Sequence, residues 1–223
     1  MTALPGIRVW GIGTSRTMRP HWMLAELGLE YETREILPRT AAMDDPDFKA
    51  LNQRGKVPVF QQGDLVIGES GAIVLHLGER HRDRADLLPF AGSPERAVFD
   101  DLFLFALMEL DAPLYVIRRH AGLPDVYGES PVAVEAAGEY FQRQVAVMDR
   151  RLADGRPYLM GPAFSAADIL LSTCLSWAGF VKLDFSGRLQ DYQARICGRE
   201  AYAQALKRNF PPGAAGVPDA STA

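Results

Sequence analysis

Two neighbouring residues, Glu69 and Ser70, have the side chains and the position to bind an amino-acid headgroup. Glu69 follows the apolar run LVIG, and Ser70 begins the segment SGAIVLHLGERH, whose apolar spacing predicts a helix. The N–H groups at a helix N-terminus favour a carboxylate, and an acidic side chain beside them can receive an ammonium. A carboxylate and an ammonium on one carbon define an α-amino acid. The same pair also suits an ordinary helix cap with an acid beside it.

A second feature is the proline in GKVPVF, residues 55–60. Within a strand, Pro58 would remove one hydrogen-bond donor from the ladder, so the simpler interpretation is an edge strand or a turn. The alternative is a cis Val57–Pro58 bond. That bond would turn the N–H and C=O of Val57 outward, where they could pair with the backbone of an extended peptide ligand.

The elements that must position these residues alternate in type along the first third of the chain. Their predicted order is strand, helix, strand, helix, strand, strand, helix, which gives one small mixed sheet with helices on both faces. Further along, no strand is predicted. A long helix is expected to begin with a Ser93 cap and to kink at Pro113, and more amphipathic helices follow. The predicted organisation is an α/β domain at 1–83, a linker at 84–93, an all-α helical domain at 94–210 and a flexible tail at 211–223.

Composition narrows the possible partners and the compartment. The 223 residues include 24 Lys and Arg against 28 Asp and Glu, and the net charge of −4 argues against nucleic acid or an anionic membrane as partner. No signal peptide and no membrane-spanning run are expected. Two cysteines without C-x-x-C spacing fit a reduced, cytoplasmic protein. The histidines at positions 21, 76 and 81 lack metal-ligand spacing, so no metal site is expected.

The chain resembles the cytosolic glutathione S-transferases along essentially its whole length. The matching segments are TSRTMRPHWMLAELGLEYE, GKVPVF, IGESGAIVLHL and FSAADILLSTCLSWA. The Val-Pro pair followed by Glu-Ser is the most specific of these features, and the opening segment is looser. The resemblance implies an α/β thioredoxin-like N-terminal domain, an all-α C-terminal domain, glutathione as cosubstrate, and a homodimer.

The resemblance assigns a set of residues to glutathione: Gln53, Lys56, Val57, Pro58, Glu69 and Ser70. The valine backbone, next to a cis proline, would pair with the cysteinyl part. The glutamate and the serine would hold the γ-glutamyl end. The lysine or the glutamine would approach the glycine carboxylate, and the lysine equally suits a solvated turn.

The resemblance also places the group that activates the glutathione thiol in the opening segment, GTSRTMR. The thiolate is the nucleophile, and a hydroxyl at a helix N-terminus can donate to the sulfur and lower the thiol pKa. Ser15 is favoured because it precedes Arg19 by four residues, as in serine-type members; Thr14 and Thr17 are the alternatives. No cysteine precedes Cys174, so disulfide exchange at this loop is not expected.

The predicted function is a glutathione transferase that adds the thiolate to a small electrophile, in detoxification. Four residues are expected to line a second-substrate pocket between the domains, although core or dimer packing explains them equally well: Leu107, Met108, Tyr115 and Arg118. Two alternatives stay open. One is a glutathione-dependent isomerase or dehalogenase, and the other is a non-catalytic glutathione-binding or interaction protein of the same fold.

Overall fold

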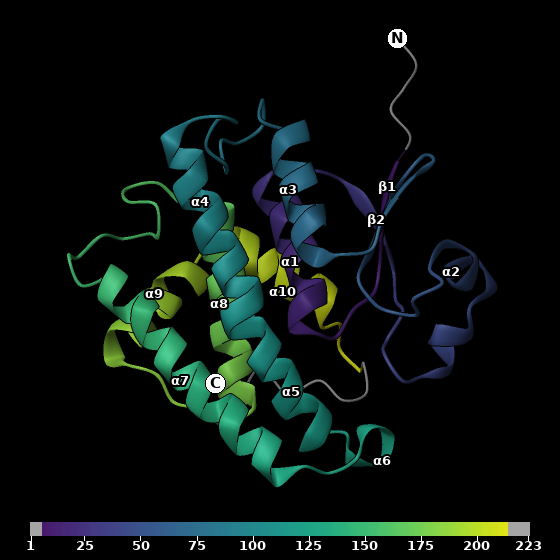
Figure 1. The fold of residues 1–223 in the computed structure, drawn as a ribbon. Helices are drawn as coiled ribbons and strands as arrows, with labels where there is room; N and C mark the ends of the chain where they lie inside the picture. Colours follow the sequence, from purple (N-terminus) through teal and green to yellow (C-terminus); the bar gives the residue numbers. More distant parts are fainter. Residues whose placement is uncertain (1–5, 214–223) are drawn as a thin grey trace. The chain divides into compact units, whose positions relative to one another are not determined.

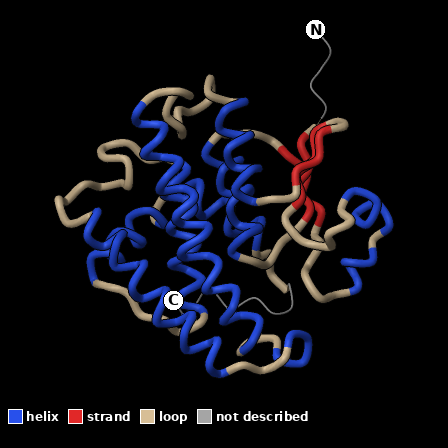
Figure 2. Tube along the Cα trace, in the orientation of Figure 1, coloured by secondary structure: helices blue, strands red, loops and turns tan. Residues whose placement is uncertain are grey.

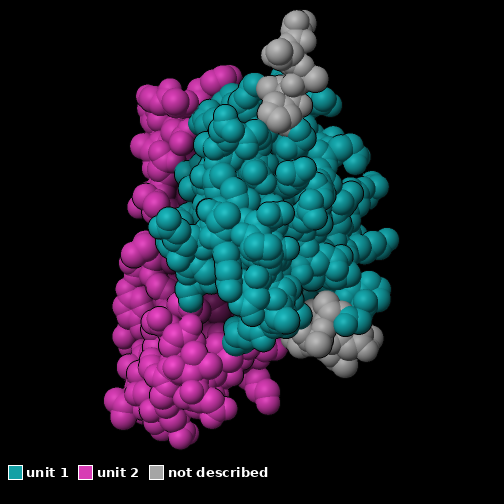
Figure 3. Space-filling view, turned by 90° about the vertical axis from the view of Figure 1, so that its right-hand side faces the viewer, with its two compact units in different colours: residues 1–85, 199–223 teal, residues 86–198 magenta. Residues whose placement is uncertain are grey.

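The structure is a computed structural model that describes residues 6–213. Within this range the chain forms two compact units, coloured separately in Figure 3. Unit 1 comprises residues 6–85 and 199–213, and unit 2 comprises residues 86–198. The predicted boundaries placed residues 199–210 in the helical domain, whereas their contacts group them with unit 1. Residues 214–223 of the predicted tail lie outside the described residues.

Unit 1 contains the predicted mixed sheet, shown in red in Figure 2. Its strands, in the spatial order β2-β1-β3-β4, are β1 (Ile7–Trp10), β2 (Tyr31–Arg34), β3 (Val59–Gln62) and β4 (Leu65–Ile67). β1 runs parallel to β2 and antiparallel to β3, with Val9 opposite Phe60. β3 begins one residue after Pro58, so the proline lies outside the ladder rather than within the strand.

The helices of unit 1 cover both faces of this sheet (Figure 1). They are α1 (Ser15–Glu26), the 3₁₀ turn η1 (Ala41–Asp44), α2 (Pro46–Leu51), α3 (Ser70–Arg80) and α10 (Glu200–Asn209). On the α2 face, Phe48 packs against Trp10 with ring centroids 6.2 Å apart. On the α3 face, Phe60 lies 5.5 Å from the ring of His76. Successive strand residues point to opposite faces, so Val59 and Phe60 contribute to different layers.

The helix α10 packs on α1 of unit 1, although it follows the helices of unit 2 in the sequence. Tyr202 stacks edge-on against Trp22 at 4.8 Å, and Arg199 makes two bonds of 2.6 Å to the carboxylate of Glu26. Amphipathic spacing indicates that one face of α10 is buried but does not say which element covers it. The contact-based grouping therefore differs from the sequence-based boundary at this helix.

Unit 2 is entirely helical within the described residues. Its elements are α4 (Pro94–Phe105), the π segment η2 (Ala106–Asp111), α5 (Ala112–His120), α6 (Pro124–Tyr127), α7 (Pro131–Arg151), α8 (Ala166–Phe180) and α9 (Gly187–Cys197). The first three form one continuous run, capped as predicted by Ser93. A π segment ends two residues before Pro113, which lacks the N–H of the regular helical bond. The kink predicted at this proline stays a prediction. Cys174 is buried in α8. No described helix has the length and apolar character needed to cross a membrane.

Candidate active site

The start of α1 is held by a reciprocal cap between two threonines. The Oγ1 of Thr14 accepts from the N–H of Thr17 at 3.0 Å, and the Oγ1 of Thr17 accepts from the N–H of Thr14 at 2.9 Å. Thr17 is fully buried. The cap position belongs to Thr14, so Ser15 is the first helical residue rather than the cap. Within residues 6–213, no hydrogen bond engages the partly exposed Ser15 hydroxyl.

Two glycines shape the loop between β1 and α1. Gly11 has a φ of 121°, and a Cβ at this position would lie 2.6 Å from the Cβ of Val57. Gly13 has a φ of 80°, and a Cβ there would lie 2.4 Å from Leu37. Only glycine combines these backbone angles with these close approaches. The loop therefore lies directly against the segment that contains Val57.

The buried imidazole of His21 is hydrogen-bonded to the same loop. The Nε2 of His21 lies 3.0 Å from the carbonyl of Gly11, and the Nδ1 lies 3.0 Å from the hydroxyl of Tyr31. Because a carbonyl only accepts, the proton is on Nε2 and Nδ1 accepts from the tyrosine. Burial lowers the pKa of His21 to about 4, so the ring is neutral near pH 7. Sequence reasoning had weighed this histidine only as a metal ligand.

The Val57–Pro58 bond is cis, which confirms the second interpretation of the proline. The buried side chain of Asn52 donates to the carbonyl of Lys56 and so holds the turn before Val57. No hydrogen bond within the described residues engages the N–H or the C=O of Val57. The side chains of Lys56 and Gln53 are exposed, and their predicted roles stay predictions.

At the start of α3, the acid and the serine have different surroundings. Glu69 occupies the cap position without capping, is exposed, and pairs with Arg54 at 2.8 Å. Ser70 is buried and accepts a hydrogen bond of 3.1 Å from Nη1 of Arg19, which is 1% exposed. Sequence reasoning missed Arg54 and used Arg19 only as a spacing mark. The contact of Arg19 joins α1 to the start of α3.

The residues predicted to line a second-substrate pocket lie in η2 and α5 of unit 2: Leu107, Met108, Tyr115 and Arg118. Tyr115 packs on Trp177 of α8, with ring centroids 6.3 Å apart. Arg118 lies over the ring of Phe180 at 5.9 Å. Met108 is 64% exposed, and Leu107 is partly buried. The two aromatic contacts fit packing within unit 2, and the predicted pocket role is not tested by them.

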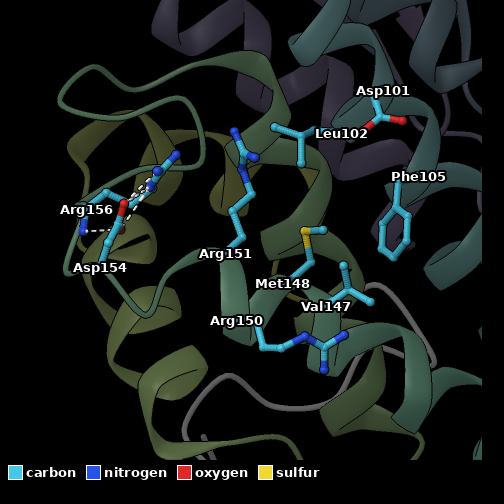
Figure 4. A pocket seen from close by; sticks show the side chains of 9 residues that line it. All are labelled: Asp101, Leu102, Phe105, Val147, Met148, Arg150, Arg151, Asp154 and Arg156. Atoms are coloured by element: carbon cyan, nitrogen blue, oxygen red, sulfur yellow. Dashed lines mark hydrogen bonds and ion pairs between the residues drawn. The ribbon is translucent and has the colours of Figure 1, made fainter.

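Unit 2 also contains a cavity of about 490 Å³ between α4 and the end of α7. Figure 4 shows the side chains that line it: Asp101, Leu102, Phe105, Val147, Met148, Arg150, Arg151, Asp154 and Arg156. Arg150 and Arg151 point in opposite directions, and Arg156 is paired with Asp154 at 2.6 Å. The guanidinium groups do not converge on one point, and none of the lining residues was predicted to act in the site. Among the described residues, no cluster of three or more histidine, cysteine or acidic side chains could hold a metal ion.

Comparison with known proteins shows the family to which the chain is similar. Residues 5–79 match the glutathione S-transferase N-terminal domain, and residues 131–207 match the C-terminal domain. The chain is 30% identical to the glutathione S-transferase-like protein gedE of Aspergillus terreus, over 95% of this chain and 99% of that protein. It superposes on a glutathione transferase from Methylococcus capsulatus with a TM-score of 0.79 and 27% identity, over 91% of this chain and 98% of the other. It also superposes on a theta class glutathione S-transferase from Xanthomonas axonopodis pv. citri with glutathione bound, with a TM-score of 0.73 and 27% identity, over 92% and 97% of the two chains.

The fold is thus a thioredoxin-like domain combined with a helical domain, the architecture of glutathione-dependent transferases. The chain belongs to the glutathione S-transferase family. It is a glutathione transferase, which confirms the fold class and the activity predicted from the sequence.

Proposed function

We propose that unit 1 binds glutathione at the N-termini of α1 and α3, and that Ser15 stabilises the thiolate that attacks a small electrophile. The observation that carries this proposal is that neither helix has an acidic residue in its first turn. At α1 the N–H of Thr17 is bonded to Thr14, and the N–H of Ser15 and the positive end of the dipole are offered to an anion from the ligand. At α3 the side chain of Glu69 makes no cap hydrogen bond, so the first N–H groups are open to a ligand carboxylate. The thiolate would lie at α1 and the γ-glutamyl carboxylate at α3.

The contact between Arg19 and Ser70 supports the carboxylate assignment. A guanidinium can only donate hydrogen bonds, so the Oγ of Ser70 accepts from it at 3.1 Å. The O–H of Ser70 is then available to donate to a carboxylate. The buried charge of Arg19 adds electrostatic attraction for the same anion.

Glu69 suits the ammonium of the γ-glutamyl group. One of its oxygens pairs with Arg54, but both side chains are more than half exposed. Exposed ion pairs contribute only about 0–1 kcal/mol, so an ammonium can bind the second oxygen or displace the arginine. The N–H and C=O of Val57, beside Pro58, have no hydrogen bond within the described residues and would pair with the cysteinyl backbone. Lys56 or Gln53 would meet the glycine carboxylate.

Thiol activation is assigned to Ser15 because its hydroxyl is uncommitted, whereas Thr14 and Thr17 cap the helix with theirs. On binding, the thiol loses its proton to solvent, and the Ser15 O–H donates to the resulting sulfur anion. The thiolate then forms a carbon–sulfur bond with the electrophile. With an aryl halide, the carbon–halogen bond breaks and halide leaves with the electron pair.

The finer parts of the prediction belong to the same proposal. We infer a homodimer that acts in the cytoplasm to detoxify small electrophiles. Met108 offers exposed apolar surface to such a substrate, and Leu107, Tyr115 and Arg118 lie on the same continuous helical run.

Conjugation of glutathione to a model aryl halide tests the role of Ser15. Loss of one hydrogen bond to the thiolate, worth about 1.5–3 kcal/mol, should lower kcat/KM about tenfold or more in Ser15→Ala. Ser15→Thr retains a hydroxyl and is the matched control, with a smaller loss. Unchanged turnover in Ser15→Ala would remove Ser15 from the mechanism. Calorimetry on Glu69→Gln should show weaker glutathione binding with the fold intact, and equal affinity would refute the ammonium site.

A further inference from the structure

The C-terminal end of α10 contacts the loop that leads into α1. Asn209 is the last residue of α10 and is fully buried. Its main-chain carbonyl accepts from the N–H of Gly13 at 2.8 Å, and its side-chain Nδ2 donates to the carbonyl of Thr14 at 3.0 Å. These two bonds hold the two residues immediately before Ser15.

The chemistry of both bonds is unambiguous. The last carbonyls of a helix lack partners inside the helix, and the N–H of Gly13 satisfies the one at Asn209. The carbonyl of Thr14 can only accept, so the amide nitrogen of Asn209 must face it. The Oδ1 of Asn209 is then buried, with no hydrogen-bond partner among the described residues. Burying an oxygen without a hydrogen-bond partner costs free energy. We therefore explain the asparagine at this position by the hydrogen bond that its Nδ2 donates, rather than by a gain in stability.

The rest of α10 fixes Asn209 with respect to the sheet and to α1. Three contacts along its length do this: the Arg199–Glu26 ion pair, the Tyr202–Trp22 ring contact and the stacking of Arg208 on Tyr31 at 4.6 Å. The asparagine is thus presented by a rigid helix rather than by a loop.

We propose that Asn209 is a positioning residue for thiol activation. The Thr14 carbonyl that it binds belongs to the same peptide group as the N–H of Ser15. This carbonyl also accepts from the N–H of Met18 and the hydroxyl of Thr17, so Asn209 is the donor from outside α1 that helps to hold the plane. As the first residue of α1, Ser15 has no intrahelical acceptor for this N–H. The contact with Asn209 therefore helps to orient the N–H of Ser15 and to fix the backbone that carries its hydroxyl. The inference rests on the proposed role of Ser15.

The test measures ionisation of the bound thiol in the full-length enzyme. The ultraviolet absorbance of the thiolate is followed against pH with saturating glutathione, and kcat and KM are measured with an aryl halide. In Asn209→Ala, the apparent pKa of the bound thiol should rise and kcat near pH 7 should fall roughly three- to tenfold. The KM for glutathione should change less than about twofold, because the γ-glutamyl site at α3 is untouched.

A control separates positioning from simple loosening of α10. Arg199→Ala removes the ion pair to Glu26 without touching the loop, and should lower the melting temperature while leaving the thiol pKa unchanged. If Asn209→Ala does not fold, Asn209→Leu fills a similar volume without the donor and carries the same expectation.

The outcomes divide cleanly. A raised thiol pKa in both Ser15→Ala and Asn209→Ala, with none in Arg199→Ala, supports the inference. A rise in Ser15→Ala alone overturns the inference and leaves the proposed function standing. An equal rise in Arg199→Ala also overturns it, because general loosening then suffices. No rise in Ser15→Ala overturns the proposed function and the inference together.

Discussion

Helices α1 and α8 both begin with a reciprocal capping box, but the box is neutral at α1 and contains a buried acid at α8. At α1, two threonines cap each other with neutral hydroxyls, and the first turn contains no acid. At α8, the acid Asp168 stands three residues after Ser165 and is completely buried. Its carboxylate accepts from the N–H and the hydroxyl of Ser165, the N–H of Leu159 and the hydroxyl of Tyr192, at 2.7–3.0 Å.

The difference shows how one local motif can serve either folding or chemistry. At α8 the positive end of the helix dipole is already complemented by a carboxylate of the protein. At α1 it is left for an anion of the ligand, and at α3 the acid at the cap position, Glu69, makes no cap hydrogen bond. Burial raises the pKa of Asp168 and the four hydrogen bonds oppose that rise, so the donors around it define a structural site.

The largest expected effect comes from removing the acid at α8. Asp168→Ala leaves four donors without their acceptor, two of them backbone N–H groups, around a fully buried position. We expect a loss of about 3 kcal/mol or more in the free energy of unfolding, measured by urea titration. The equivalent change at α1, Thr17→Val, should cost only about 1 kcal/mol, the usual value of a helix cap. Equal losses at the two helices would contradict the distinction drawn here.

A second prediction concerns the neutral support beneath the α1 loop. The pKa of His21 is lowered from 6.5 to about 4 in the folded protein, so the unfolded chain takes up a proton at a higher pH than the folded one. Its contribution to stability is complete above pH 6.5, falls as the pH drops below 6.5, and is fully lost below about pH 4. The total is about 3 kcal/mol from the shift in pKa.

The measurement is the free energy of unfolding between pH 8 and pH 5, in wild type and in His21→Gln. The variant should be less stable at pH 8 and should lose less stability on acidification. The pKa values of His76 and His81 are also lowered by burial, but both residues are present in the two proteins and cancel in the difference. Parallel curves would show that His21 is not the group responsible.

The sequence predicted the parts of this site whose signal is local. The Val57–Pro58 pair and the Glu69–Ser70 pair are short motifs, and the structure places each at the expected element boundary. The order of strands and helices in unit 1 also follows from periodicity, because one face of each element is buried. These features depend on neighbours in the chain.

What the sequence could not show were contacts over long separations. Asn209 and Thr14 are 195 residues apart, and Arg19 and Ser70 are 51 apart. A buried arginine or asparagine looks like an ordinary polar residue on a helix until its partner is known. The packing of α10 on α1 was not predicted for the same reason, because the sequence does not show which element covers its apolar face.

The smallest expected effect, at Thr14, tests the comparison of α1 with α8 most directly. An acid placed there should lower the activity without lowering the stability. Aspartate is at least as good a cap as threonine, so Thr14→Asp should leave the stability unchanged or raise it by a few tenths of a kcal/mol. The same carboxylate would occupy the positive end of α1 and repel the thiolate. A charge at a helix terminus contributes about 0.3–1 kcal/mol. The repulsion should therefore raise the pKa of the bound glutathione thiol and lower kcat/KM about two- to fivefold near pH 7. Thr14→Asn caps equally well without a charge and should keep near wild-type activity. If Thr14→Asp and Thr14→Asn behave alike in the thiol titration, then the absence of an acid at α1 has no part in catalysis, and the contrast with α8 is one of packing alone.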